Sequence, residues 1–167
     1  MFESYLLLIF PVAMAFAAMF DLFTMTIPNK ISLVLFGSFL AVAPLTGMEW
    51  EQFFSHLGIG FAVLAVGIAL FAFGLLGGGD AKLLAAASLW IGYHDLPAYL
   101  MWVAVLGAGL AFAILFYRRI LPPHFMLKLD WAMRLHNKKE GIPYGIALAG
   151  AALLTFPTTS WFLSVAG

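Results

Sequence analysis

Cysteine is absent from this chain of 167 residues, and charged side chains make up only 10% of it. The absence of cysteine excludes disulfides, thiolate metal ligands and a cysteine nucleophile. The formal net charge is zero, so nothing in the sequence indicates a basic surface for nucleic acid. The serine-hydrolase pattern G-x-S-x-G and the zinc-protease pattern H-E-x-x-H are also missing. We therefore expect no metal, no cofactor and no nucleic-acid partner.

Hydrophobic residues are abundant instead, at 64% of the chain, and the mean hydropathy is +1.03. A soluble domain of this size cannot bury so many apolar side chains, whereas a lipid bilayer surrounds them on the outside as well. The first apolar run starts at Tyr5 without a basic segment before it and ends directly before Asp21, which favours a retained membrane span over a signal peptide. The sequence thus predicts an integral membrane protein with a single domain over residues 1–167.

Six apolar runs are candidates for membrane spans. Each must be helical, because lipid offers no hydrogen-bond partners to an open backbone. The fourth run is too short to cross a hydrocarbon core of about 30 Å at about 1.5 Å per residue, so we expect its glycine-rich lead-in to complete it. Proline should bend the first and last spans, at Pro11 and Pro157. The predicted fold is an all-α bundle of six transmembrane helices, at residues 4–22, 31–47, 53–76, 81–93, 98–117 and 143–163.

The positions of the basic residues orient this bundle. With six spans, all eight Lys and Arg side chains fall on one side of the membrane, and the opposite loops, TGMEWEQ and GYHDLP, carry only acidic charge. Basic loops favour the cytoplasm. The sequence therefore predicts a multi-pass protein of the cytoplasmic membrane with both termini outside and with these residues inside: Lys30, Lys82, Arg118, Arg119, Lys128, Arg134, Lys138 and Lys139.

Residues 118–142 form the longest polar segment. Within HFMLKLDWAMRLH, apolar residues from Phe125 to Met133 recur at helical spacing opposite Lys128 and Arg134. This pattern predicts an amphipathic helix in the membrane interface, and the basic charge fits contact with anionic lipid. The alternative is a solvated linker that merely follows the charge bias of cytoplasmic loops.

Two acidic residues fall neither on the predicted outer side, which includes Glu3 near the N-terminus, nor in the basic segment. Asp21 follows the first apolar run and Asp80 opens the fourth, so both should lie near the same membrane face. Placing a carboxylate at membrane depth costs free energy, so such a side chain usually faces a cavity or a partner. Alternatively, each carboxylate marks an interface, with Asp80 capping its helix through backbone N–H groups.

A close pair of aspartates can hold a single proton between them, because two adjacent carboxylates do not both ionise easily. Such a pair suits peptide hydrolysis: one carboxylate takes a proton from water while the other donates a proton to the scissile carbonyl oxygen. Two rival interpretations stay open. The pair could relay protons or cations in a small transporter or channel, or the protein could be a non-catalytic membrane scaffold.

Three glycines precede Asp80. Gly77, Gly78 and Gly79 remove side chains where a substrate backbone would approach, and they permit the positive φ angles with which a helix can begin abruptly inside a membrane. The alternative is a flexible turn between two spans. Lys82 is expected to extend to lipid phosphate, or else to set the electrostatics of the aspartate pair.

These features resemble the type IV prepilin peptidases, a family of membrane aspartic proteases with a GxGD motif. The glycines and Asp80, followed by Lys82, match GxGD-x-K, and Asp21 matches the family's first aspartate, a few residues before an I-P-N element. A third match lies at the start of the last span, where the family has a proline-tyrosine-glycine entrance. The matching residues are Asp21, Ile27, Pro28 and Asn29, then Gly77, Gly78, Gly79, Asp80 and Lys82, and finally Pro143, Tyr144 and Gly145.

The resemblance implies that Asp21 and Asp80 cut prepilins or pseudopilins between a short basic leader and an apolar stem, at the cytoplasmic boundary of the bacterial membrane. Larger family members carry a cysteine-containing insertion linked to methylation of the new N-terminus, and this chain has no cysteine. It therefore resembles the short, peptidase-only branch associated with tight-adherence (Flp) pili. The family also often has an arginine soon after the first aspartate, where this sequence has Phe23 and Thr24.

Several of the matching residues also have plain structural interpretations. Pro28 and Asn29 can form a turn and the N-cap of the second span. Tyr144 can anchor the chain at the membrane interface, and Pro143 is harmless in the first turn of a helix.

Overall fold

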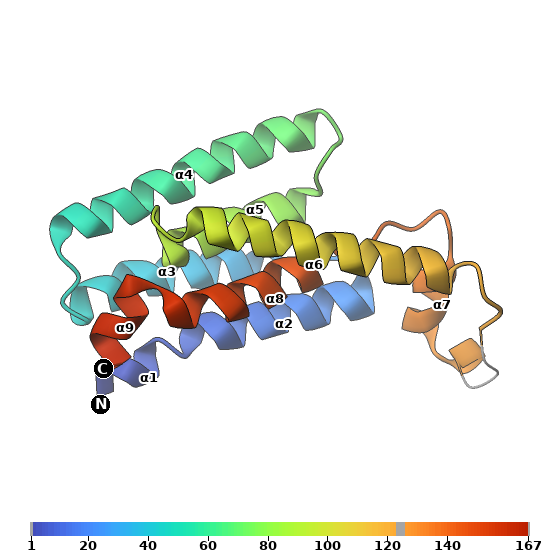
Figure 1. Ribbon diagram of the computed structural model, residues 1–167, viewed down its shortest axis with the longest axis horizontal. Helices are drawn as coiled ribbons and strands as arrows, with labels where there is room; N and C mark the ends of the chain where they lie inside the picture. Colours follow the sequence, from blue (N-terminus) through green and yellow to red (C-terminus); the bar gives the residue numbers. More distant parts are fainter. Residues whose placement is uncertain (1, 123–125, 167) are drawn as a thin grey trace.

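The computed structural model describes residues 2–122 and 126–166, and every regular element in this part of the chain is helical, as Figure 1 shows. The all-α prediction is confirmed. The elements are α1 (Phe2–Leu6), α2 (Ile9–Thr24), α3 (Asn29–Leu45), α4 (Trp50–Ala72), α5 (Gly78–Ile91), α6 (Leu96–Tyr117), the 3₁₀ turn η1 (Met126–Lys128), α7 (Asp130–His136), α8 (Gly145–Thr155), the 3₁₀ turn η2 (Phe156–Thr158) and α9 (Ser160–Ala166).

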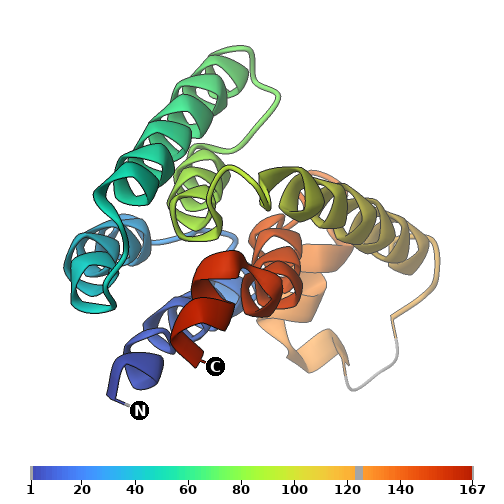
Figure 2. The ribbon, with the colours of Figure 1, turned by 60° about the vertical axis from the view of Figure 1, so that its left-hand side comes forward.

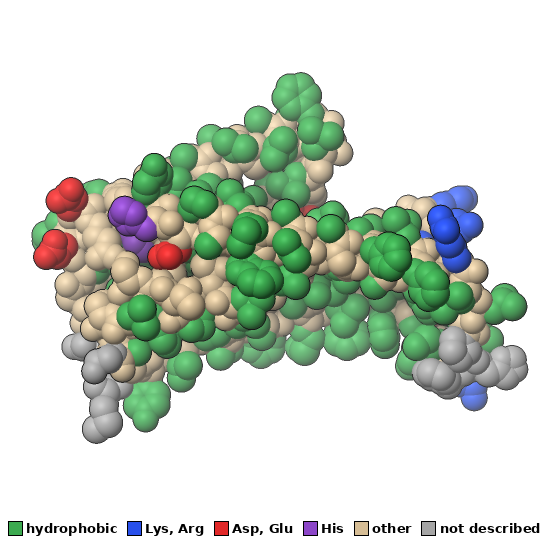
Figure 3. Space-filling view, in the orientation of Figure 1, with side chains coloured by type: hydrophobic (Ala, Val, Ile, Leu, Met, Phe, Trp, Pro, Cys, Tyr) green, Lys and Arg blue, Asp and Glu red, His purple; other side chains and the backbone are tan. Residues whose placement is uncertain are grey.

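The longer helices run back and forth along the length of the molecule (Figure 1). Both termini and the α3–α4 and α5–α6 connections lie at one end, and the segment around α7 lies at the other. On the face shown in Figure 3, Asp and Glu side chains gather at the first end and Lys and Arg side chains at the second. We call these the acidic end (Glu49, Glu51 and Asp95) and the basic end (Arg118 and Arg119).

Helix length and apolar character support three or four membrane crossings in the part of the chain that the structure describes. Within residues 2–122 and 126–166, three helical stretches are long and apolar enough to cross a membrane: Ser4–Thr24, Trp50–Ala72 and Leu96–Tyr117. A fourth is reached if Gly145–Thr158 and Ser160–Ala166, which are bent by 56°, count as one span. The two remaining runs form α3, with 17 residues, and α5, with 14. All six predicted runs are helical, but six crossings stay a prediction.

Helix α5 is short because the glycine-rich lead-in adds only a few helical residues. It begins at Gly78 and ends at Ile91. At about 1.5 Å per residue, its length is about 21 Å. The helix contacts α3, α4, α6 and α8, and every side chain from Ala85 to Ile91 is buried. Because protein surrounds it, α5 does not have to match the thickness of lipid.

Small residues let α4 approach α5 closely. A methyl group on Gly60 would lie 3.1 Å from Leu89 Cδ1, and one on Gly67 would lie 3.0 Å from Ala81 Cβ. Such contacts are typical of helix pairs in membranes, where van der Waals packing drives association. Figure 2 shows α4 at the edge of the bundle, beside α5.

Aromatic rings fill the interior toward the acidic end. Neighbouring ring centroids lie between 4.5 and 6.3 Å apart, within the range of favourable aromatic contacts. Both indole N–H groups donate hydrogen bonds, one to a backbone carbonyl and one to a threonine hydroxyl. We call this group the aromatic cluster: Phe10, Phe39, Trp90, Phe156 and Trp161.

Of the two predicted proline bends, the one at Pro157 is confirmed, whereas Ser4–Thr24 still counts as one helical stretch and a bend at Pro11 stays a prediction. The first span is interrupted at Leu7 and Leu8, one turn before Pro11, whose ring nitrogen cannot donate to the Leu7 carbonyl. That carbonyl accepts a 3.3 Å hydrogen bond from Phe10 instead. In the last span, Pro157 lies in η2, where the flanking helices diverge by 56°.

Candidate active site

Asp21 lies in the last turns of α2 and is only 5% exposed. Its Oδ2 accepts a 2.7 Å hydrogen bond from the backbone N–H of Gly145. Gly145 is the first residue of α8, where N–H groups have no partner within the helix and the helix dipole favours negative charge. Pro143, two residues earlier, is buried. The predicted entrance to the last span therefore holds the first aspartate.

Gly145 fits at this position because it has no side chain. A methyl group there would lie 2.8 Å from Asp21 Oδ2 and 2.9 Å from Ile27 Cδ1. Tyr144 lies against the neighbouring helix α6: a methyl group on Gly107 would be 2.8 Å from its Cε1. Gly145 therefore lies against α2, and Tyr144 lies against α6.

Ile27 packs between the other two motifs. Its Cδ1 faces Gly145, and a methyl group on Gly79 would lie 3.3 Å from its Cβ. The chain reaches this position through Met25, which follows α2 with a φ of 55° and donates its N–H to the Asp21 carbonyl. A methionine with left-handed backbone is strained. Sequence reasoning missed Met25, because no residue type in TMTIPN signals a positive φ.

Pro28 and Asn29 begin α3, but not in the predicted way. Pro28 is the residue before the helix, with φ −61° and ψ 130°, and no side chain caps the start of α3. Asn29 is the first helical residue, and its Oδ1 accepts a 2.9 Å hydrogen bond from Lys82 Nζ. The predicted N-cap role of Asn29 is therefore wrong, since its side chain is directed toward α5. Lys82 is exposed, yet it joins α5 to α3.

Asp80 lies in the first turn of α5 and is half-buried. Its Oδ2 lies against Gly77, where a methyl group would be only 2.5 Å away. No side chain caps the start of α5, so the capping role considered for Asp80 is wrong.

The three glycines before Asp80 provide space rather than unusual backbone angles. The expected positive φ is not found at any of them, and it occurs nearby at Gly74, with a φ of 71°. Methyl groups at the three positions would approach Asp80, the Phe71 ring (3.3 Å) and Ile27 in turn. The glycines thus let a carboxylate, a ring and the I-P-N element approach the start of α5.

Asp21, near the end of α2, and Asp80, in the first turn of α5, both lie toward the basic end of the bundle (Figure 1). Gly145, Ile27 and Gly79 connect them through direct contacts. Within the described residues, no three His, Asp or Glu side chains converge where they could hold a metal ion. What the fold assembles here is a pair of carboxylates surrounded by backbone.

The segment 118–142 forms less helix than predicted. Only η1 and the seven residues of α7 are helical, and Phe125 lies outside the described residues. Ala132 and Leu135 are buried, so one face of α7 packs on the protein. Helix is therefore found only in the second half of the predicted segment, where its apolar face contacts α2 and α6, and its position in the membrane interface stays a prediction.

Two arginines of this basic segment are used inside the protein, and sequence reasoning missed this role. Arg134 donates a 2.6 Å hydrogen bond to the Phe23 carbonyl, two residues after Asp21, and Trp131 contacts the Phe23 ring edge-on. Arg118 donates three hydrogen bonds to backbone carbonyls of residues 135, 140 and 141. Charge alone could not reveal these partners, because carbonyl groups are present at every residue.

Comparison with known proteins places these residues in context. A sequence profile of the type IV leader peptidase family matches residues 8–114, which include both aspartates and end before Pro143. A curated protein named prepilin leader peptidase/N-methyltransferase, from Bacillus subtilis (strain 168), is 30% identical over 141 residues. The match covers 83% of this chain and 50% of that protein, so the chain spans about half the length of this curated relative. No solved structure matches.

Proposed function

Because the chain belongs to the type IV leader peptidase family, we propose that it is a membrane aspartic endopeptidase that removes the leader peptide from type IV prepilins. The observation that carries this proposal is the hydrogen bond from Gly145 to Asp21, together with the contacts of Ile27 on Gly145 and Gly79. These contacts bring three separate sequence motifs around two carboxylates. A scaffold protein has no need of such an arrangement.

Water is the nucleophile in the proposed reaction. Asp21 Oδ2 already accepts the Gly145 N–H, so its other oxygen takes a proton from water as the water oxygen adds to the scissile carbonyl carbon. Asp80, which is half-buried and therefore reachable, donates a proton to the carbonyl oxygen. When the tetrahedral intermediate collapses, the C–N bond breaks, the leaving nitrogen receives the proton from Asp21, and Asp80 recovers its own proton from the hydroxyl.

The substrate is a prepilin or pseudopilin with a short basic leader and an apolar stem, and the cut falls between them. The basic end faces the cytoplasm in this proposal, and the termini lie outside. The lack of cysteine favours the short branch that serves tight-adherence (Flp) pili. Anionic lipid contacts the cations of the 118–142 segment that the protein leaves exposed, Arg119, Lys128, Lys138 and Lys139.

Cleavage of a candidate Flp-type prepilin by the purified protein in detergent tests the proposal, with mass spectrometry locating the cut. Asp21→Asn and Asp80→Asn should each lower kcat by on the order of 1000-fold or more, because neither carboxamide can exchange a proton with water or substrate. Asp95→Asn at the acidic end is the matched control and should retain full activity.

Three outcomes would contradict the proposal. Normal cleavage by either active-site variant would remove that carboxylate from the mechanism. Proton or ion flux in proteoliposomes that is lost in the same variants, without any peptidase activity in the wild type, would favour a transporter. Normal pilus assembly in cells carrying both substitutions would favour a scaffold.

A further inference from the structure

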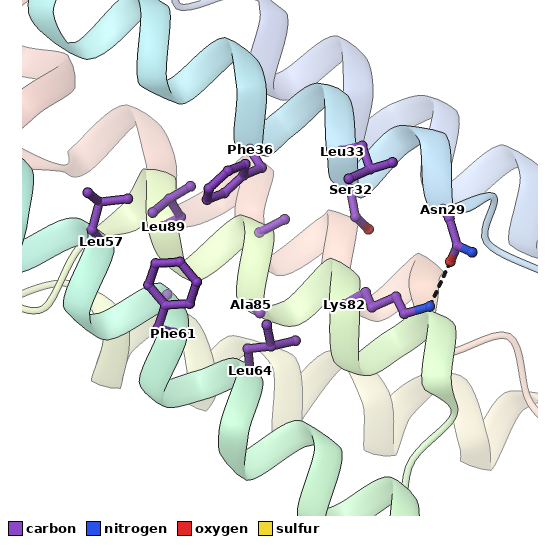
Figure 4. A pocket seen from close by; sticks show the side chains of 12 residues that line it. Asn29, Ser32, Leu33, Phe36, Leu57, Phe61, Leu64, Lys82, Ala85 and Leu89 are labelled. Carbon is purple, nitrogen blue, oxygen red and sulfur yellow. Dashed lines mark hydrogen bonds between the residues drawn. The ribbon is translucent and has the colours of Figure 1, made fainter.

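A groove of about 430 Å³ lies between α3, α4 and α5, outside the pair of carboxylates (Figure 4). Small residues of α4 and α5, among them Gly60 and Ala85, leave room for it, and larger apolar side chains project toward it. Some of these side chains are exposed in the free protein, with Leu33 at 66% and Phe61 at 57%. We call it the lateral groove and define its apolar part by Phe36, Phe61, Leu64, Ala85 and Leu89.

One end of the lateral groove is polar. Asn29, Ser32 and Lys82 lie there, and Figure 4 shows the hydrogen bond between Lys82 and Asn29. Ser32 Oγ is buried and has no hydrogen-bond partner within the described part of the chain. Lys82 is two residues from Asp80, so the polar end of the groove lies at the same end of α5 as the candidate active site, although neither aspartate lines the groove.

We infer that the lateral groove binds the first two turns of the substrate's apolar stem, with the helix N-terminus of the stem at the polar end. This inference rests on the proposed function, and it adds the place where the protein binds the apolar stem of the substrate. Seven residues separate Lys82 from Leu89 along α5, which corresponds to about 10 Å or about two helical turns. The groove can therefore accept the side chains of one face of a short helical stretch.

The polar end distinguishes a peptide from a lipid chain. The first four N–H groups of a helix have no partner within the helix, and inside a membrane they need acceptors from protein. Asn29 Oδ1, which also accepts from Lys82 Nζ, and the unpartnered Ser32 Oγ offer acceptor oxygens for these N–H groups at the polar end of the groove. An acyl chain brings no donor that would use these oxygens.

Photocrosslinking in bilayer nanodiscs tests the position of the stem. A photoreactive amino acid replaces Leu64 in the lateral groove or, as control, Phe112, which is 74% exposed on α6. Both are placed in the Asp80→Asn variant, which is expected to hold the prepilin without cutting it. We expect an adduct from position 64 to the first two turns of the stem and none from position 112. Adducts only with lipid, adducts with a second copy of the chain, or equal yields at both positions would each overturn the inference.

Filling the groove gives a second test. Ala85→Leu should raise KM by about tenfold with kcat changed less than about twofold, because the lost contacts bind the stem before and during the reaction alike. Ala113→Leu, on the exposed face of α6, is the matched control and should leave both constants unchanged. An unchanged KM in Ala85→Leu would overturn the inference while leaving the proposed peptidase intact. Failure of the wild type to cut any prepilin would instead contradict the proposed function, and crosslinking would still report on the groove.

Discussion

At the acidic end of the bundle large aromatic rings fill the interior, whereas at the basic end glycines and backbone groups surround two carboxylates. The rings bury large areas and fix the helices relative to one another through packing. The glycines bury little surface area, but they let a backbone N–H and a carboxylate approach within hydrogen-bond distance. The difference indicates that stability is concentrated at one end and the candidate chemistry at the other.

Acidic residues occur at both ends, so acidity alone does not mark the site. Glu49, Glu51 and Asp95 line a hollow of about 380 Å³ at the acidic end, and the two glutamates are exposed. Asp21, in contrast, is 5% exposed and is held by a backbone N–H. Burial and a specific donor are what separate a candidate catalytic carboxylate from a solvated one.

Among substitutions that keep both carboxylates, the largest effect is expected from adding a single methyl group at the basic end. In Gly77→Ala the new Cβ would lie 2.5 Å from Asp80 Oδ2, so the carboxylate must move. Displacing a catalytic group by about 1 Å can cost about 100-fold in rate, and we expect a loss of kcat of that order with little change in stability. Gly109→Ala is the control, since nothing lies within 4 Å of that position. Equal activity of the two variants in the prepilin assay would show that the space at Gly77 is not needed.

At the acidic end the opposite result is expected. Trp90→Ala removes a fully buried ring from the aromatic cluster, together with its 2.8 Å hydrogen bond to the Leu35 carbonyl. We expect a loss of about 2 kcal/mol in the free energy of unfolding, because packing rather than hydrophobic transfer holds helices together in a membrane. Activity per folded molecule should be unchanged. Denaturation in mixed micelles and cleavage rates measure the two effects, with Trp102→Ala, at 38% exposure, as control. A large fall in kcat would contradict the separation of the two ends.

The contrast between the ends also explains what the sequence could predict. Apolar runs and proline positions can be read directly from the sequence, which is why the six helical segments and the bend at Pro157 agree with the prediction. The order of the motifs predicted Asp21, Asp80 and Gly145 as one site; in the structure Gly145 donates to Asp21, and Ile27 lies against both Gly145 and Gly79, the neighbour of Asp80.

Partners of individual side chains could not be predicted, because several partners satisfy the same residue equally well. Asn29 was expected to cap α3 but accepts a hydrogen bond from Lys82, which was expected to extend to lipid. Arg118 and Arg134 looked like any cytoplasmic cations, yet they bind backbone carbonyls. Each choice depends on the distance between two helices, and no local pattern encodes that distance.

A moderate effect is expected where the basic segment contacts α2. Arg134→Ala removes the hydrogen bond to the Phe23 carbonyl near Asp21, so the end of α2 becomes less well fixed. We expect kcat to fall by roughly fivefold with KM unchanged, a pattern typical of a residue that positions a catalytic group. Arg134→Lys should restore part of the loss, because an ammonium can still donate to the carbonyl. Arg119→Ala, an exposed neighbour in the same segment, is the control. A rise in KM alone would indicate that Arg134 acts on substrate instead.

The smallest effect is expected at the strained turn after α2. Met25 has a φ of 55°, a conformation that costs roughly 1–2 kcal/mol for a residue with a side chain. Met25→Gly relieves this strain but makes the unfolded chain more flexible, so the free energy of unfolding should change by about 1 kcal/mol or less, and activity should persist. Met25→Ile keeps the size of the side chain, but β-branching makes left-handed backbone still less favourable, so both stability and kcat should fall. Denaturation and cleavage measured side by side separate the variants: if glycine harms kcat as much as isoleucine does, the methionine side chain, rather than the left-handed backbone, positions Asp21.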